Sequence, residues 1–228
     1  MKKRLDQYKG KLTVSQIVEG INAATANAKR LASSAALLFK NEDYALAASI
    51  SALSIEESGK VPILRAMAVS RNEQELTEEW KRFRSHTNKN IQWLILELFS
   101  KGARRLDDFS SLFAEDAEHP YLLDQIKQIG FYTDCLGKAH WSVPVEIIDQ
   151  KLAQTLVQTA EILANGKKIT STEIELWIKH ISPVWKRSKE QMEHGLVQWY
   201  KAMQDQGLAK AGTNEMEEFI LRGIGKTK

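Results

Sequence analysis

The chain has 228 residues, enough for one large domain or two small ones with a core that needs no covalent cross-links. Hydrophobic residues make up 43% and charged residues 27%, which is the balance of a soluble globular protein. With only 12 Gly and 4 Pro, the chain is not a turn-rich all-β protein and has no long disordered tract.

The net charge of +3 permits contact with nucleic acid but is far from that of proteins with a dense basic face for binding it. Cys135 is the single cysteine, so an intramolecular disulfide and a thiolate zinc cluster are excluded. No apolar run reaches the roughly 18 residues that cross a bilayer. The basic start at 1–4 leads into polar residues rather than the apolar stretch of a secretory signal. We therefore expect a cytoplasmic protein that makes no contact with a membrane.

Helical periodicity covers five long stretches, and almost nothing alternates as a strand does. The first begins at a capping box formed by Thr13 and Gln16. The second, 43–69, has no charge between Asp43 and Glu56, which predicts a helix surrounded by other helices. The third spans 73–101.

The later part of the chain is less regular. A short helix is expected at 120–129, ended by Gly130, and 131–142 has the composition of a loop or a small hairpin. Pro144 suits the first turn of a fourth helix at 145–164.

Thr172 is expected to cap a fifth helix, which Ser182-Pro183 interrupts. The remaining residues suggest a peripheral tail at 207–228 with one short helix, 215–222, capped by Asn214. We predict a single all-α domain at 1–206, a bundle of about five long helices with a small irregular insertion.

The first group of residues with chemical potential lies in the second helix. Glu57 continues an apolar line that consists of Leu46, Ile50 and Leu53. A carboxylate at such an inward position needs a partner, and Lys60 is within reach of Glu57 and Glu56. Pro62 cannot donate to the carbonyl of Ser58, so the helix is expected to be kinked near Gly59. The group is either a functional site or a structural ion pair that aligns helices.

The second group lies in the third helix, where four residues form one ridge: Arg82, His86, Lys89 and Trp93. Cations beside His86 would lower its pKa and hold an anion such as a phosphate against it. The imidazole could then act as a general acid or base near neutral pH. The alternative is a solvated basic face whose imidazole covers the core.

A third group follows Gly130 and includes Tyr132, Asp134 and Trp141. Aromatic residues interleaved with Gly, Asp and Pro suggest a loop pinned onto the bundle, with a structural role. The sequence has no Gly-rich phosphate loop and no His-Glu-x-x-His zinc signature. None of its histidines follows a Glu at the spacing of a di-iron bundle. We therefore expect no metal and no cofactor.

Three blocks of the sequence, in this order, resemble the AbiV family of bacterial abortive-infection proteins, part of the HEPN superfamily. The first is 44–60, which ends in Ser-Ile-Glu-Glu-Ser-Gly-Lys, and the second is Phe-Arg-Ser-His-Thr-Asn-Lys at 83–89. The third is Gly-Phe-Tyr-Thr-Asp at 130–134 followed by Trp-Ser-Val-Pro at 141–144. The resemblance covers about 12–165.

The resemblance implies an all-α HEPN bundle, often a homodimer, that acts in defence against phage. Many members of the superfamily are metal-independent ribonucleases with an Arg and a His separated by four to six residues. Arg82 and Arg84 are too close to His86 for that motif, and Arg187 with His194 is the literal match.

Two hypotheses for function follow. In the first, the protein acts on RNA or translation as a ribonuclease: His86 transfers the proton, Lys89 and Arg82 neutralise the phosphate, and Glu57 and Lys60 orient the site. Three further residues would then contact RNA: Arg84, Arg187 and His194. In the second, the chain is a non-catalytic helical module that binds a phage or host protein. A scaffold or small-ligand bundle unrelated to defence is a third reading, which leaves the resemblance unexplained.

Overall fold

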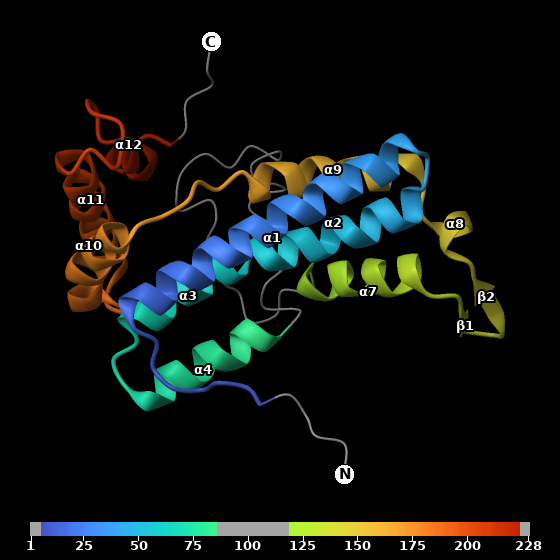
Figure 1. The fold of residues 1–228 in the computed structure, drawn as a ribbon, viewed down its shortest axis with the longest axis horizontal. Coiled ribbons are helices and arrows are strands. Elements are labelled where there is room, and N and C mark those ends of the chain that lie inside the picture. Colours follow the sequence, from blue (N-terminus) through green and yellow to red (C-terminus); the bar gives the residue numbers. More distant parts are fainter. Residues whose placement is uncertain (1–5, 86–118, 224–228) are drawn as a thin grey trace.

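The computed structural model describes residues 6–85 and 119–223, and these form a helical bundle with one small hairpin (Figure 1). The central helix is α2 (Tyr44–Ser58), which packs against α1 (Val14–Lys40), α7 (His119–Phe131) and α9 (Gln150–Ala164). The predicted all-α class is confirmed. No helix within the described ranges combines the length and apolar character that spanning a membrane demands.

The capping box predicted at the start of α1 is present. Thr13 Oγ1 accepts a hydrogen bond from the Gln16 amide, and the Gln16 side chain accepts one from the Thr13 amide. The buried face of α1 is rich in alanine, so the α2 backbone approaches closely. Ser54 Oγ donates directly to the main-chain carbonyl of Ala28, 2.8 Å away.

The inward face of α2 differs from the predicted one. Leu46 is exposed, and the buried residues are mostly small: Ala45, Ala48, Ser49, Ala52, Ile55 and Glu56. Because α2 is covered by three helices, close packing favours small side chains on its buried face. The predicted apolar line of Leu46, Ile50 and Leu53 lies on a less buried side of the helix. In this orientation of α2, the side chain that enters the core is that of Glu56 rather than that of Glu57.

The predicted interruption of the second helix is found at Gly59, where α2 ends and α3 (Lys60–Val69) begins. Next, α4 (Glu73–Arg84) packs against α3. Ser85 has an extended backbone, with φ −77° and ψ 130°, so the helix predicted to continue to residue 101 ends at Arg84. Of the predicted ridge, Arg82 lies in α4, and His86, Lys89 and Trp93 lie outside the described residues.

Gly130 does not end its helix, because α7 continues through it to Phe131. A Cβ atom at Gly130 would lie 2.2 Å from Ser49 Oγ and 3.0 Å from the Ala45 carbonyl oxygen. The glycine therefore allows α7 to contact α2.

After α7 the chain forms a hairpin of two antiparallel strands, β1 (Asp134–Leu136) and β2 (His140–Ser142). The predicted fourth helix is divided into α8 (Pro144–Ile147) and α9, with Asp149 capping α9.

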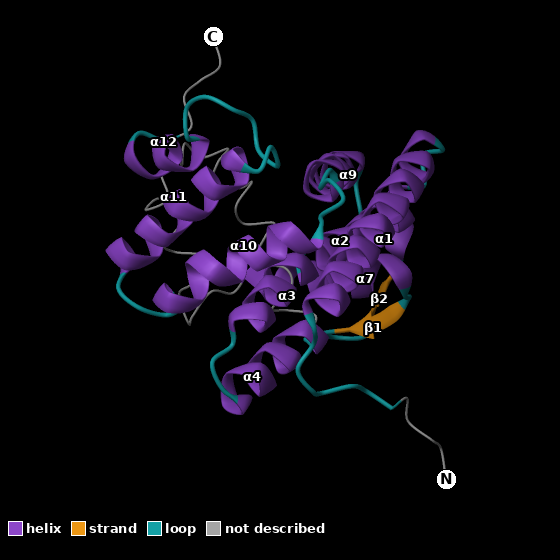
Figure 2. Cartoon of the chain, turned by 60° about the vertical axis from the view of Figure 1, so that its left-hand side comes forward, coloured by secondary structure: helices purple, strands orange, loops and turns teal. Residues whose placement is uncertain are grey.

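The C-terminal helices are grouped at one side of the bundle (Figure 2). They are α10 (Ser171–Ile181), α11 (Lys189–Asp205) and α12 (Glu215–Leu221), with a short 3-10 helix, η2 (Ser182–Val184), between the first two. The break at Ser182-Pro183 and the Asn214 cap are confirmed. The cap of α10 is Thr170, not Thr172, because Thr170 forms a reciprocal capping box with Glu173.

Candidate functional site

A buried ion pair joins α2 to α7. Lys127 Nζ lies 2.8 Å from Glu56 Oε1 and 2.8 Å from Asp124 Oδ1. Glu56 is 4% exposed and the Lys127 side chain 8%. The inward carboxylate expected at Glu57 is thus Glu56, and its partner comes from another helix.

Lys127 is held as a cation by its two carboxylates. Burial lowers the pKa of Lys127, but hydrogen bonds to Asp124 and Glu56 outweigh burial and leave the pKa above its ordinary value. Because two carboxylates hold the ammonium and it stays charged near neutral pH, the group serves to align α2 with α7.

The second pair is more accessible. Lys60 Nζ lies 2.5 Å from Glu57 Oε1, and each side chain is about one-fifth exposed. The Lys60 ammonium also lies 5.3 Å from the centre of the Phe83 ring of α4. The start of α3 therefore faces α4.

Two cations of α4, Arg82 and Arg84, are engaged within the protein. Arg82 forms two hydrogen bonds to the Glu79 carboxylate, at 2.9 and 3.0 Å. Arg84 donates to the Tyr8 carbonyl and lies 4.6 Å from the centre of the Trp80 ring. The two residues expected to carry the chemistry, His86 and Lys89, lie outside the described residues, so their roles remain predictions.

Arg187 and His194 are both exposed, and only His194 is helical. Ser188 caps α11, so Arg187 precedes the helix that contains His194. Their proposed contact with RNA remains a prediction.

The third group of predicted residues is not packed onto the bundle. Tyr132 is 62% and Trp141 70% exposed. Asp134 is also exposed, and its carboxylate accepts a hydrogen bond from the adjacent Cys135 amide. The small hairpin is one of the two forms expected for this segment, but the expected packing onto the bundle is wrong: the strands pair with one another, and these aromatic side chains are left in solvent.

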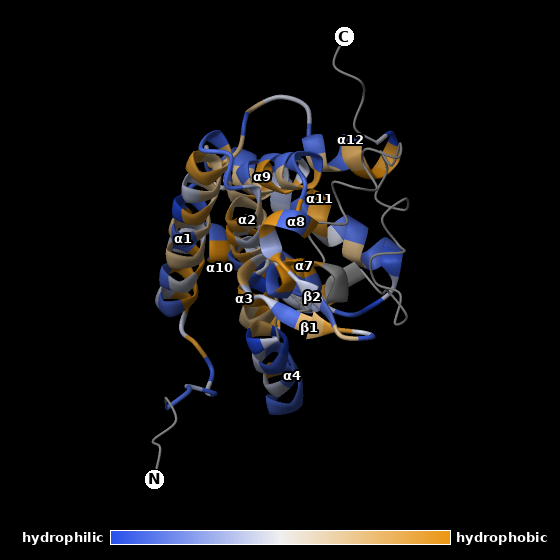
Figure 3. Ribbon diagram, turned by 90° about the vertical axis from the view of Figure 1, so that its right-hand side faces the viewer, coloured by the Kyte–Doolittle hydropathy of each residue, from blue (hydrophilic) through white to orange (hydrophobic). Residues whose placement is uncertain are grey.

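Further apolar side chains are exposed at the same end of the molecule. They are Leu136 of β1 and two residues of α8, Val145, which is 74% exposed, and Ile147. Figure 3 views this end directly, with β1, β2 and α8 toward the reader. We call Tyr132, Leu136, Trp141, Val145 and Ile147 the hairpin surface.

A model of the AbiV family, of the HEPN class, matches residues 16–165. The chain belongs to the AbiV family. No curated protein and no solved structure matches it. The matched region contains the Glu56–Lys127 pair, the Glu57–Lys60 pair and the hairpin surface, whereas α10 to α12 lie beyond it.

Membership of the AbiV family indicates a role in abortive infection, a defence against phage, and the HEPN class indicates a link to RNA. Within the described ranges, no cluster of His, Cys, Asp or Glu side chains is arranged to hold a metal ion.

Sequence reasoning missed Lys127 and Asp124, although the pattern of α7 contained the necessary information. Leu123 and Ile126 are buried, and Lys127 follows Leu123 by four positions, which places it on the same inward face. A lysine at such a position needs a carboxylate partner. The choice of Glu56 depends on the orientation of α2, which the alanine-rich pattern leaves undetermined.

Proposed function

We propose that this AbiV protein arrests phage infection by binding a phage or host protein through its hairpin surface. The observation that carries the proposal is the exposure of Trp141 and Val145, at 70% and 74%, on neighbouring elements. Large apolar side chains exposed on neighbouring elements at one end of a molecule are typical of a site for a protein partner. A two-stranded hairpin is only marginally stable alone, so a partner would also stabilise it.

The ion pairs of the predicted polar residues favour binding of a protein partner over cleavage of RNA. Lys60 is paired with Glu57, Arg82 with Glu79, and Lys127 with Glu56 and Asp124. A phosphate would have to displace a carboxylate from each of these cations. We therefore rank the protein-binding hypothesis above the ribonuclease hypothesis. The sequence alone suggested the opposite ranking.

Plaque formation on bacteria that express Trp141→Ser or Val145→Ser tests this proposal. We expect each variant to weaken partner binding roughly tenfold or more and to restore plaques toward the level of unprotected cells. The matched control is Leu37→Ser, because Leu37 is a comparably exposed apolar residue of α1. Circular dichroism melts and immunoblots should show that all variants are folded and equally abundant.

Full protection by both hairpin variants would overturn the proposal. A second copy of the chain is the competing occupant of this surface, since the family resemblance implies a homodimer. Sedimentation of wild type and Trp141→Ser distinguishes the two: a wild-type dimer that becomes a monomer in the variant would assign the surface to self-association.

The second candidate function is a metal-independent ribonuclease centred on His86, acting on RNA or translation. It is favoured by the position of Lys60 over Phe83, because Phe83 precedes His86 by three residues. Glu57 and Lys60 thus lie beside the part of the chain that leads to the histidine.

This candidate predicts that wild type cleaves total bacterial RNA or tRNA in EDTA and that His86→Ala, with an unchanged melt, does not. His140→Ala is the matched control, because His140 is exposed and lies outside both proposed RNA sites. If His194→Ala loses cleavage and His86→Ala retains it, the literal motif with Arg187 is the site. Absence of cleavage by wild type would contradict the ribonuclease hypothesis for the isolated protein.

A further inference from the structure

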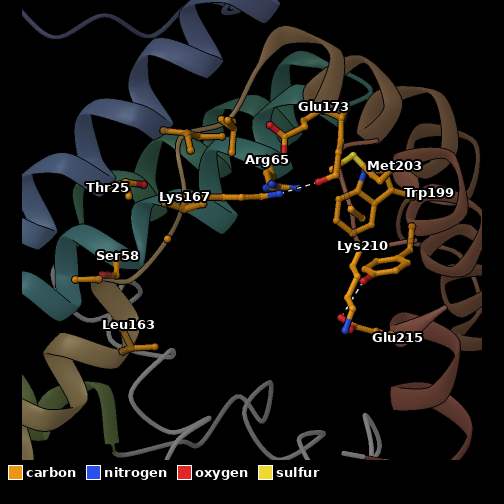
Figure 4. Close-up of a pocket in the computed structure, with 18 residues that line it drawn as sticks. Thr25, Ser58, Arg65, Leu163, Lys167, Glu173, Trp199, Met203, Lys210 and Glu215 are labelled. Carbon is orange, nitrogen blue, oxygen red and sulfur yellow. Dashed lines mark hydrogen bonds between the residues drawn. The ribbon is translucent and has the colours of Figure 1, made fainter. Parts of the chain in front are cut away.

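A cavity of about 490 Å³ lies between the AbiV region, residues 16–165, and the C-terminal helices (Figure 4). On one side it is lined by Ser58 of α2 and Arg65 of α3. On the other side it is lined by Trp199 of α11 and by Lys210 in the segment that follows α11. Both parts of the chain are therefore needed to form this cavity, and no residue of the hairpin surface lines it.

Arg65 is a half-buried cation without an ion-pair partner. Its guanidinium carbon lies 5.3 Å from the centre of the Trp177 ring and 5.5 Å from that of the Trp199 ring, so both rings attract the cation and fix its position. Within residues 6–85 and 119–223, the Arg65 side chain makes no hydrogen bond and lies within ion-pair distance of no carboxylate. A guanidinium carries five N–H donors in a rigid fork that matches the two oxygens of a carboxylate.

The surroundings of Arg65 favour an anion beside it. Burial lowers the pKa of Arg65, and the charge of the Glu173 carboxylate opposes that effect only in part. Glu173 is itself buried, and its Oε2 accepts a hydrogen bond from the Thr170 amide, 2.7 Å away. Because Glu173 offsets the burial of Arg65 only in part, an anion placed against the guanidinium would stabilise its charged form.

The charges that line the cavity indicate how much negative charge its occupant carries. Three cations and two carboxylates are found among the described lining residues, which leaves a net charge of one positive unit. Lys210 and Glu215 lie side by side in Figure 4, so their charges offset each other. The other charges are those of Arg65, Lys167 and Glu173. One negative charge balances this set, whereas the two charges of a phosphate monoester would place excess negative charge beside Glu173.

Lys167 supplies the second group that can hold an anion. Its side chain extends across the cavity toward the side of Arg65 in Figure 4, and Nζ donates to the Leu208 carbonyl over 2.7 Å. An ammonium has three N–H donors, so Lys167 can donate to a ligand as well as to this carbonyl. Arg65 and Lys167 therefore form the polar end of the cavity.

The rest of the lining favours a ligand with an apolar body. Apolar side chains from both parts of the chain line the cavity: Ile21, Val61, Leu163, Met203 and Leu208. The volume is that of a small-molecule site. A site with one charged end and an apolar lining is suited to a ligand with the same two parts, because each part then keeps a favourable environment.

We propose that this cavity binds a small aliphatic carboxylic acid in its ionised form. The carboxylate would accept hydrogen bonds from Arg65 and Lys167, and the alkyl chain would pack against Met203 and the other apolar side chains. Because the ligand would contact both the AbiV region and the C-terminal helices, its binding would stabilise their association. The proposal does not depend on the role of the hairpin surface.

Titration calorimetry on the full chain near neutral pH tests the site, with octanoate as the probe. Three comparison compounds each change one property of the probe: acetate lacks the long alkyl chain, 1-octanol lacks the charge, and octyl phosphate carries about two charges. We expect octanoate to bind and each comparison compound to bind at least roughly tenfold more weakly. Hexanoate should bind about tenfold more weakly than octanoate, since two buried methylene groups are absent.

Arg65→Met and Lys167→Met should each weaken octanoate binding about tenfold or more. Lys168→Met is the matched control, because Lys168 is an exposed neighbour of Lys167 that does not line the cavity, and it should leave the affinity unchanged. Thermal melts show whether each variant is folded. Octanoate should raise the Tm of wild type and of Lys168→Met but not that of Arg65→Met.

Absence of octanoate binding by wild type, or binding that neither Arg65→Met nor Lys167→Met weakens, would overturn the site. Lys167→Met keeps the test decisive if Arg65→Met unfolds. Octyl phosphate that binds as tightly as octanoate would overturn the assignment to a singly charged anion, and 1-octanol that does so would reduce the site to an apolar cavity. Plaque assays on the hairpin variants are independent of these results.

Discussion

Lys127 occupies a position at which a lysine is tolerated only with partners. Its ammonium is removed from water and compensated by two carboxylates, Glu56 from α2 and Asp124 from its own helix. Such a pair does not necessarily stabilise a protein more than apolar residues would, but removing one partner leaves a buried charge. The pair therefore specifies how α7 sits on α2.

Lys127→Met should lower the free energy of unfolding by about 3 kcal/mol, because Glu56 would lose its buried cation. Urea unfolding at neutral pH measures the change, with Lys168→Met as a nearly neutral surface control. The double variant Glu56→Leu/Lys127→Met should recover much of the loss. A loss below about 0.5 kcal/mol in Lys127→Met would show that the pair has no role in stability.

The pH dependence of this contribution has a definite sign. The pKa of Lys127 is higher in the folded protein than its ordinary value, so folding favours the protonated lysine. The stabilisation is therefore complete below the unfolded pKa, at about pH 10, and is lost as pH rises through the folded pKa. The difference in stability between wild type and Lys127→Met should not change from pH 6 to pH 8.

At the scale of elements, close helix contacts depend on small residues. Ala28 and Ser54 meet where α1 crosses α2, and Gly130 allows α7 to approach Ser49. In an exposed helix a glycine costs about 1 kcal/mol relative to alanine. At Gly130 the packing of α7 against α2, which a Cβ atom would prevent, outweighs that cost in helix stability.

Gly130→Ala should destabilise the protein by about 1–3 kcal/mol, because the new methyl group would overlap Ser49 and crowd a main-chain oxygen of α2. Gly20→Ala on α1 is the matched control, since its Cβ would meet only the flexible Leu64 side chain, at 3.3 Å. The control should be neutral or slightly more stable than wild type. Equal unfolding midpoints in urea for the two variants would contradict the expected contact between α7 and α2.

At the scale of the whole molecule, the C-terminal segment is attached to α11 by side chains. Asn214 Nδ2 donates to the Val197 carbonyl over 3.0 Å, and Gln204 Nε2 donates to the Lys210 carbonyl over 2.7 Å. Lys167 also reaches this segment through the Leu208 carbonyl. The segment expected to be peripheral thus covers α11 and forms part of the cavity wall.

Deleting residues 207–228 should lower the free energy of unfolding by about 2 kcal/mol, a fall in Tm of roughly 4–8 °C. The physical reason is the loss of these hydrogen bonds and the exposure of Met203, which is buried. Calorimetry on both chains measures the change, and Asn214→Ala in the full chain should reproduce about half of it. Identical melting of the deleted and full chains would exclude a stabilising role.

Local patterns of the sequence were sufficient for much of the fold. The Thr13–Gln16 capping box, the interruption between Ser58 and Lys60, the Asn214 cap and the all-α class depend on hydrogen bonds and backbone geometry within a few residues. The order of three short blocks was sufficient to indicate the AbiV family, which the match to residues 16–165 confirms. Neighbouring residues determine these features, so sequence spacing reveals them.

Only the tertiary structure decided which charges meet and which apolar residues are exposed. Glu56 and Glu57 are adjacent in the sequence. The orientation of α2 against its three neighbouring helices pairs Glu56 with Lys127 and Glu57 with Lys60. The segment around Trp141 has a composition typical of a packed loop. Trp141 is nevertheless exposed, because β1 and β2 pair only with each other at the end of the bundle. Arg65 and Lys167 are about 100 residues apart in the sequence and line one cavity only because the C-terminal helices pack against the AbiV region. These features depend on contacts between distant segments, and local spacing does not contain that information.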